Sequence, residues 1–289
     1  MKYLVFGSAN IDKVYNVEEI VKKGQTISSS KQSIFAGGKG FNQAIALARS
    51  KTETYFAGCL GKDGDLLIDQ LKKDNINTDY IKRSDNDCGH AIIQVDKNGD
   101  NSIIIAPGSN FEIYKEDIDN ILLNFDKQDL ILLQNEISNL KYIIDKAYEL
   151  EMIIALNPSP YNDAINQIDL SKVDILLINE VEGKEISGYE DYEMILKVLH
   201  KKYPKMLVVL TLGSKGVSCI NKEGIIYHKD AVLVRTVDTT GAGDTFTGYF
   251  ISNFEKGLIE AIDIANKAAA ISVSRQGASS SIPYKEEIK

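Results

Sequence analysis

The sequence predicts an α/β fold: a three-layer α/β/α sandwich around a mostly parallel sheet, with a second, smaller sheet beside it. Short apolar runs recur along the 289 residues and alternate with segments of helical periodicity. These runs are continuously apolar, as in strands that are covered on both faces. Strand–helix alternation favours a parallel sheet with right-handed crossovers. A hairpin signal that falls outside this alternation predicts the second sheet.

The main sheet is predicted from its apolar runs, in chain order. Its strands are Tyr3–Ser8, Thr54–Leu60, Asp129–Asn135, Met152–Asn157, Ile175–Asn179 and Leu207–Leu212. Amphipathic helices are predicted between them at Asp65–Lys73, Leu140–Leu150 and Tyr192–Lys202. A hairpin of Val217–Ile220 and Ile225–His228 is expected to form an antiparallel edge, and a short helix is expected from Tyr284 onward.

Two segments break the pattern and predict the small sheet. Residues 11–35 are rich in β-branched and polar residues, and His90–Asp96 and Ser102–Ala106 flank an Asn98-Gly99 pair. Asn-Gly between two apolar β-type runs is a strong hairpin signal. We therefore expect a core of residues 1–10, 36–88 and 107–289, and a small β lid of residues 11–35 and 89–106.

Composition excludes several classes of protein. Lys plus Arg number 33 against 41 Asp plus Glu, a net charge of −8, which argues against non-specific nucleic-acid binding. No apolar stretch approaches the ~20 residues of a membrane span, and the N-terminal apolar run is too short for a signal peptide. The scattered cysteines at 59, 88 and 219 predict neither a disulfide framework nor a metal site. A cytoplasmic protein is expected.

A first glycine-rich motif, Gly37-Gly38-Lys39-Gly40, precedes a helical pattern that begins at Phe41. Glycine lets the backbone approach a ligand closely, and free N–H groups at a helix start can bind it. Lys39 and Asn42 would face the same space. The motif lacks P-loop spacing. A plain glycine turn before a packed helix is an equally good interpretation of this motif by itself.

A second motif, Gly241-Ala242-Gly243-Asp244, also begins a helix. Its small residues leave backbone N–H groups open to an anion, and the helix dipole favours negative charge there. A transferring phosphoryl group would be stabilised at such a place. Asp244 would then be placed to take a proton from an attacking hydroxyl. The alternative is that Asp244 only complements the helix dipole.

Two further polar groups follow predicted strands, where ligands bind in open parallel sheets. Asn179 and Glu182 follow the run Ile175–Ile178, and their donor types suit phosphate and hydrated Mg²⁺. Taken alone, Asn179 is better interpreted as a helix N-cap. The segment Thr211–Gly216 is also at a strand end, where an ordinary turn is the simpler interpretation.

Together these motifs resemble the ribokinase-like (PfkB) carbohydrate kinases over essentially the whole chain, from Gly7–Asp12 to Ala268–Ala278. The segments Gly37–Ala44 (GGKGFNQA), Leu132–Glu136 (LLQNE), Ala155–Pro160 (ALNPSP) and Ser281–Ile288 (SIPYKEEI) also carry the resemblance. It implies phosphorylation of a sugar by ATP, with ribose phosphorylated at its 5-hydroxyl as the leading expectation. It also implies Mg²⁺, a monovalent cation, usually potassium, and a homodimer paired through the lid.

The resemblance assigns roles by position. The catalytic base would be Asp244, and the anion hole would be Gly241, Ala242 and Gly243. Sugar contacts would come from Asn10, Asp12, Gly38, Lys39, Asn42 and Glu136. Nucleotide contacts would come from Asn179, Thr211, Gly213, Ser214, Gly243 and Asn266. Glu182 would hold Mg²⁺ through water. The potassium ligands, some of them main-chain carbonyls, would be Asp238, Thr240, Ser272, Arg275, Gly277 and Ser281.

Departures from the family pattern leave the sugar open. They are Lys22–Thr26, Phe41, His90 and Pro107–Asn110, all in or near the lid and the expected sugar pocket. Fructose, 2-keto-3-deoxygluconate, adenosine or pseudouridine therefore remain alternative substrates. A catalytically silent sugar- or nucleotide-binding regulator is the alternative from another class, although Asp244 and the glycines argue against it. A dinucleotide-dependent oxidoreductase is disfavoured because no GxGxxG follows the first strand.

Overall fold

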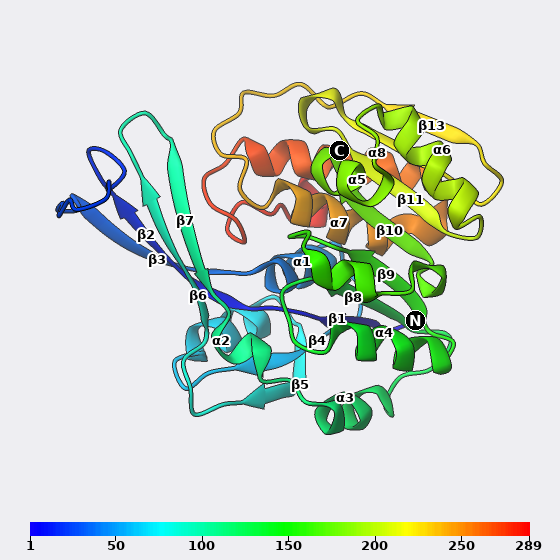
Figure 1. Ribbon diagram of the computed structural model, residues 1–289, viewed down its shortest axis with the longest axis horizontal. Helices are drawn as coiled ribbons and strands as arrows, with labels where there is room; N and C mark the ends of the chain where they lie inside the picture. Colours follow the sequence, from blue (N-terminus) through cyan, green and yellow to red (C-terminus); the bar gives the residue numbers. More distant parts are fainter.

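The computed structural model describes all residues, 1–289, and contains two separate sheets (Figure 1). The large sheet has nine strands in the order β13-β12-β11-β10-β9-β8-β1-β4-β5. Neighbours from β11 to β5 pair in parallel, and β12 and β13 are antiparallel. The bounds are β1 Tyr3–Phe6, β4 Thr54–Leu60, β5 Asn77–Arg83, β8 Leu130–Gln134, β9 Ile153–Asn157, β10 Ile175–Asn179, β11 Leu207–Thr211, β12 Val217–Ile220 and β13 Ile226–Lys229.

The α/β prediction is confirmed, and the predicted strands of this sheet agree with the observed ones to within two residues at each end. One strand was not predicted. Strand β5 pairs with β4 along the outer edge of the sheet. Its sequence, NTDYIKR, mixes polar and apolar residues and is only partly buried, so it lacks the continuous apolar run that marks central strands.

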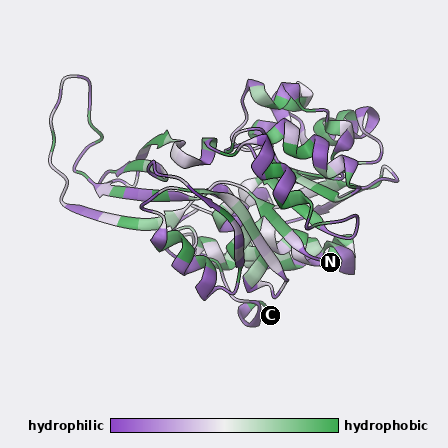
Figure 2. Ribbon diagram, turned by 90° about the horizontal axis from the view of Figure 1, so that it is seen from below, coloured by the Kyte–Doolittle hydropathy of each residue, from purple (hydrophilic) through white to green (hydrophobic).

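Helices cover both faces of the large sheet. Helices α1, α2, α7 and α8 contribute to one hydrophobic core, and α3, α4 and α6 to the other. Alternate strand residues divide between the cores: Tyr3 and Val5 face one, and Leu4 and Phe6 the other. The bounds are α1 Lys39–Arg49, α2 Asp65–Lys73, α3 Lys115–Leu122, α4 Leu140–Glu149, α5 Glu180–Ser187, α6 Tyr192–Lys202, α7 Ala242–Asn253 and α8 Leu258–Val273. In Figure 2 the helices carry alternating bands of hydrophilic and hydrophobic residues, as expected for helices that pack one side against a sheet.

The second sheet has four strands in the order β3-β2-β6-β7 and projects from the core (Figure 1). Its strands are β2 Asn10–Asn16, β3 Lys31–Gly37, β6 Gly89–Val95 and β7 Asn101–Ala106. Strand β2 pairs antiparallel with β3 and parallel with β6. The hairpin predicted around Asn98-Gly99 is the β6–β7 pair. We call this four-stranded sheet the lid.

Short 3₁₀ turns complete the chain. The helix expected from Tyr284 onward is a single 3₁₀ turn at Lys285–Glu287. The others are Gly108–Phe111, Asp163–Gln167, Leu170–Lys172, Gly213–Lys215 and Phe254–Lys256. None of the helices combines the length and the hydrophobicity that crossing a lipid bilayer requires.

Candidate active site

A cavity of about 270 Å³ opens at the carboxyl ends of the parallel strands. The ends of β9, β10 and β11 form one side, and the first turns of α1 and α7 form the other. Its lining residues are Lys39, Asn157, Ser159, Leu177, Ile178, Asn179, Glu182, Thr211, Thr239, Gly241, Gly243, Asp244 and Thr247. Residues from motifs far apart in the sequence therefore meet in one space, where ligands bind in open parallel sheets.

Asp244 lies in the first turn of α7 with its carboxylate fixed by two amides. Asn42 Nδ2 donates to Oδ2 and Gln43 Nε2 donates to Oδ1, each at 2.9 Å. Gln43 is itself held, because its Oε1 accepts a hydrogen bond from Gln134 Nε2 at 2.7 Å. Asp244 is nearly buried, and both side chains that donate to its carboxylate come from α1.

The start of α7 presents unpaired backbone donors. Gly241, the N-cap, has φ +75°, a left-handed conformation that favours glycine. The Ala242 amide bonds weakly to Thr239 O at 3.3 Å, whereas the amides of Gly243 and Asp244 have no acceptor in the protein. A Cβ added at Gly243 would meet nothing within 4 Å, so this side of the turn is open. Such a turn can receive an anion.

The glycines of the first motif allow α1 to start directly against the end of β1. A Cβ on Gly40 would lie only 2.6 Å from the Ser8 nitrogen. Gly38 has φ +94°, and the Phe41 amide donates to Ser8 O at 2.8 Å. The close approach places Lys39 at the cavity beside Glu136, whose Oε2 accepts from the Lys39 amide at 3.2 Å.

Lys39 is surrounded by negative charge. Burial disfavours its ammonium form, but three carboxylates outweigh that effect and raise the pKa of Lys39 above its usual value. They are, in order of effect, Asp244, Glu136 and Glu182. Burial in turn raises the pKa of Glu136, although Lys39 and a hydrogen bond from Ser8 partly oppose this. Lys39 is therefore a permanent positive charge between carboxylates.

Asp12 lies on β2, the first strand of the lid, and its carboxylate accepts no hydrogen bond from the protein. It lies over Gly37, where a Cβ would come within 2.1 Å of Oδ2. Burial, followed by the charges of Glu136 and Asp244, raises the pKa of Asp12 to about 7. A half-buried carboxylate without partners is an acceptor available to a ligand with hydroxyl groups.

Asn10 is held at the junction of lid and core by a residue that the sequence did not identify as functional. Asn110 Nδ2 donates to Asn10 Oδ1 at 2.7 Å, and Asn110 Oδ1 accepts from the Ala9 amide at 3.0 Å. Gly89 allows this contact, since a Cβ there would collide with both amides. The Pro107–Asn110 segment therefore holds the place where the chain passes from the core into the first lid strand, β2.

At the end of β10, Asn179 is the N-cap of α5, as the simpler interpretation had it. Its Oδ1 accepts from the amides of Val181 and Glu182, and Glu182 Oε2 accepts from the Asn179 amide at 2.8 Å. Both residues nevertheless line the cavity, as does Thr211. Glu182 Oε1 makes no hydrogen bond within the protein, so the capping role leaves one oxygen free.

The residues expected to bind a monovalent cation lie in the loop before α7, at the C-terminal end of α8 and in the loop that follows α8. Asp238 accepts from the amides of Thr240 and Gly277, both at 2.9 Å, and these bonds outweigh the effect of burial and lower its pKa. Ser272 and Ser281 are buried with their hydroxyls 2.9 Å apart. The Arg275 side chain pairs with Glu287, so its guanidinium is engaged away from Asp238.

Some predicted nucleotide residues lie outside this cavity. Gly213 and Ser214 form an exposed 3₁₀ turn after β11. The side chain of Asn266 is engaged elsewhere, since its Nδ2 donates to Asp230 O at 2.7 Å. Sequence reasoning also missed Gln43, the second donor to Asp244. Its signal was a glutamine directly after Asn42, on a helix that the packing pattern otherwise fills with apolar residues.

Comparison with known proteins agrees with this arrangement. Residues 1–285 match the family model described as pfkB family carbohydrate kinase. The chain is 34% identical to the ribokinase of Staphylococcus aureus, covering 99% of this chain and 98% of that protein. It is similar to ribokinase structures from Cryptococcus neoformans with ADP (TM-score 0.88, 29% identity, 99% and 98% covered) and Arabidopsis thaliana with ribose and ATP (0.86, 29%, 99% and 96%). The chain belongs to the pfkB family of carbohydrate kinases.

Proposed function

We propose that this chain transfers the γ-phosphoryl group of ATP to the 5-hydroxyl of ribose, giving ADP and ribose 5-phosphate. The observation that carries the proposal is the position of the Asp244 carboxylate. The side-chain amides of Asn42 and Gln43 hold it beside the unpaired backbone N–H groups of Gly243 and Asp244. A base and an anion site at one helix start are what phosphoryl transfer to a hydroxyl requires. The ribokinase relatives support ribose as the acceptor.

In the proposed reaction, Asp244 accepts the proton of the ribose 5-hydroxyl as that oxygen attacks the γ-phosphorus. The bond from the γ-phosphorus to its bridging oxygen breaks, and ADP leaves. The amides at the start of α7 stabilise the negative charge on the transferring group. Lys39 adds a permanent positive charge to the same cavity.

The sugar is proposed to bind between the lid and α1. Asp12 has a free carboxylate, and Asn42 Oδ1 is buried without a partner, so both can accept hydrogen bonds from hydroxyls. The other proposed contacts are Asn10, Gly38, Lys39 and Glu136. The nucleotide is proposed to contact Asn179, Thr211, Gly213, Ser214, Gly243 and Asn266 along the strand ends.

The donors at the cavity fit a magnesium ion that is held mainly by ATP and water. No cluster of three or more metal-binding side chains exists, but Glu182 has a free oxygen beside Asn179. Mg²⁺ keeps several waters and takes few protein ligands. Such an ion would neutralise charge on the ATP phosphates. Glu182 would orient one of its waters.

A monovalent cation is proposed between the two loops that Asp238 joins. Its ligands would be main-chain and side-chain oxygens of Asp238, Thr240, Ser272, Arg275, Gly277 and Ser281. Support comes from the bonds that bring Asp238 against Gly277 and Ser272 against Ser281. The cation would then stiffen the segment directly before Gly241.

A homodimer through the lids is proposed because the lid exposes apolar side chains. Ile103, Ile104 and Ile105 on β7 and Ile34 and Phe35 on β3 are all about half exposed. An apolar two-sided sheet favours pairing with a second copy. We also propose that the protein works in the cytoplasm, where its three free, buried thiols would stay reduced.

The test is an ADP-release assay with ribose, deoxyribose, fructose, 2-keto-3-deoxygluconate, adenosine and pseudouridine, with phosphorus NMR to locate the phosphate. We expect the highest kcat/KM with ribose and phosphate on its 5-hydroxyl. Faster turnover of another acceptor would replace ribose while leaving the chemistry in place. If none of these compounds stimulates ADP release, the kinase assignment would be contradicted and a sugar-binding regulator favoured.

A further inference from the structure

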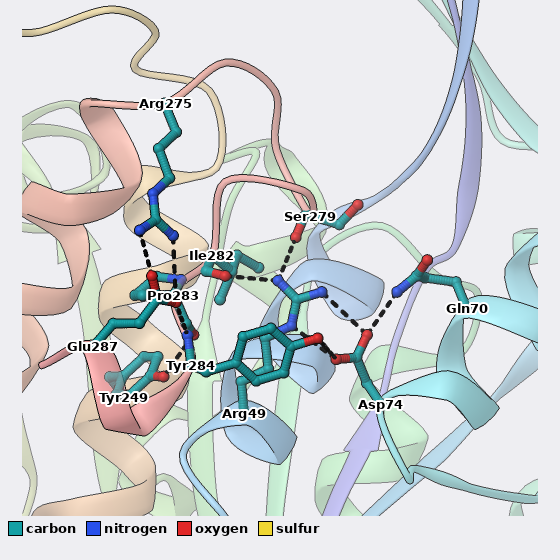
Figure 3. A network of polar contacts seen from close by, with 10 residues as sticks. All are labelled: Arg49, Gln70, Asp74, Tyr249, Arg275, Ser279, Ile282, Pro283, Tyr284 and Glu287. Atoms are coloured by element: carbon teal, nitrogen blue, oxygen red, sulfur yellow. Dashed lines mark hydrogen bonds and ion pairs between the residues drawn. The ribbon is translucent and has the colours of Figure 1, made fainter.

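Arg49, the last residue of α1, joins three parts of the chain from a buried position. Its Nε and Nη2 donate to the two carboxylate oxygens of Asp74 at 2.8 and 3.2 Å. Its Nη1 donates to the main-chain carbonyls of Ser279 and Ile282 at 2.9 and 2.6 Å (Figure 3). The guanidinium thus ties the C-terminal loop, residues 276–284, to α1 and to the end of α2.

The surroundings fix the guanidinium in one orientation. The Asp74 side chain is fully buried and also accepts from Gln70 Nε2 at 2.6 Å. The Tyr284 ring lies 4.7 Å from the guanidinium carbon (Figure 3). A planar fork that makes four hydrogen bonds cannot be replaced by the single ammonium of lysine.

The loop that Arg49 holds packs against the phosphate-binding turn. A Cβ on Gly241 would lie 3.1 Å from Ala278 Cα, so Ala278 lies directly behind this glycine. The neighbouring Gly277 amide donates to Asp238 Oδ2 at 2.9 Å. Two adjacent residues of the loop therefore contact the segment that leads into α7 at both of its ends, Asp238 and Gly241.

The opposite end of the same helix reaches the catalytic carboxylate. Asn42 and Gln43, in the first turns of α1, donate to Asp244, while Arg49 at its C-terminus holds the loop. Helix α1 and the loop thereby contact the start of α7 from two directions. Loss of the Arg49 contacts would free one of the two.

We propose that Arg49 is a positioning residue for phosphoryl transfer, which keeps the Gly241–Asp244 turn aligned through Gly277 and Ala278. The inference rests on the proposed kinase function. A positioning role can be distinguished from a purely stabilising one. A contact that only stabilises the fold changes the fraction of folded protein and leaves the kcat of the folded protein unchanged. Positioning affects kcat more than the KM of either substrate.

The test compares Arg49→Lys with Leu122→Ala at a temperature where both are fully folded. Leu122 is buried on α3 beneath the other face of the sheet, so its truncation destabilises the protein without touching the loop. We expect Arg49→Lys to lose about tenfold to a hundredfold in kcat, with both KM values within about twofold of wild type. Leu122→Ala should keep the wild-type kcat.

A binding measurement provides a second readout. ADP with aluminium fluoride and ribose imitates the transferring phosphoryl group, so its affinity should fall in Arg49→Lys while the affinity for ADP alone stays. If Arg49→Lys does not fold, Asp74→Asn, which keeps the shape of the site and removes its charge, should show the same pattern more weakly.

The inference would be overturned if folded Arg49→Lys kept the wild-type kcat. If only Asp74→Asn folds, a wild-type kcat in that variant would overturn it. A loss no larger than that of Leu122→Ala would do the same. In both cases the kinase assignment would stand, because the wild-type protein would still turn over. A wild-type protein inactive on every acceptor would instead contradict the proposed function, and the inference with it.

Discussion

Gln43 Nε2 donates to Asp244 Oδ1 at 2.9 Å, linking the N-terminal half of α1 to the first turn of α7. Gln43 is fully buried and accepts in turn from Gln134, so the amide cannot rotate freely. Asp244 therefore points at the cavity because of a second layer of amides. This relationship yields a prediction that does not depend on which sugar binds.

Replacing Gln43 with Leu should lower kcat by about tenfold to a hundredfold, because the carboxylate loses one of the two donors that orient it. The sugar KM should change little, since Gln43 lies behind Asp244. Steady-state kinetics on the folded variant provide the measurement. An unchanged kcat would mean that Asn42 alone orients the carboxylate.

Sugar affinity should depend on the ionisation of Asp12. Its pKa is raised to about 7, so the protonated form accumulates as the pH falls through that value. The ionised carboxylate accepts hydrogen bonds from hydroxyls more strongly than the protonated acid does, so the KM for ribose should fall as pH rises through about 7 and then level off. Asp12→Asn should raise the KM and remove this pH dependence. A KM for ribose that is the same in the wild type and in Asp12→Asn would exclude Asp12 from the sugar site.

Potassium should increase turnover relative to sodium at matched ionic strength. A cation between the Asp238 and Gly277 loops would stiffen the segment before Gly241, so the effect should fall on kcat. Asp238→Asn should remove the difference between the two salts. Equal wild-type rates in both salts would count against a functional cation site.

The lid should pair with a second copy of itself. Ile104 on β7 and Ile259 on α8 are equally exposed, at 62% and 64%, but only Ile104 lies on the lid. Ile104→Lys should produce monomers with a raised sugar KM, because burying a lysine against an apolar partner is unfavourable. Ile259→Lys serves as the matched control and should remain dimeric. Light scattering that reports a wild-type monomer with normal sugar affinity would rule out the lid dimer.

The large sheet was predictable because its central strands are buried on both faces and leave continuous apolar runs. Leu207–Thr211, with the sequence LVVLT, is one example, and such a run is recognisable without knowing which strands lie beside it. The edge strand β5 escaped prediction because its exposed side removes that signal. The hairpin at Asn98-Gly99 predicted β6 and β7, whereas β2 and β3 were expected only as one segment, residues 11–35. The parallel pairing of β2 with β6 joins residues about 80 apart and leaves no local trace.

The candidate site was predictable only where local chemistry is distinctive. The glycines around Lys39 and Asp244 mark helix starts by their sequence alone. Gln43 and Asn110 act through bonds to residues about 200 and 100 positions away, which a single sequence does not reveal. The same holds for Arg49, whose partners become visible only when the C-terminal loop is folded against α1.

The central claim is that Asp244 removes the proton from the attacking hydroxyl. Asp244→Asn keeps the size of the side chain and removes the base, so single-turnover kinetics should show a rate lower by about 10² to 10⁴. Calorimetry on the same variant should show ATP and ribose still bound, since the amides of α7 and the residues of the lid remain. A variant that keeps more than about a tenth of the wild-type rate would contradict the assignment of Asp244 as the general base.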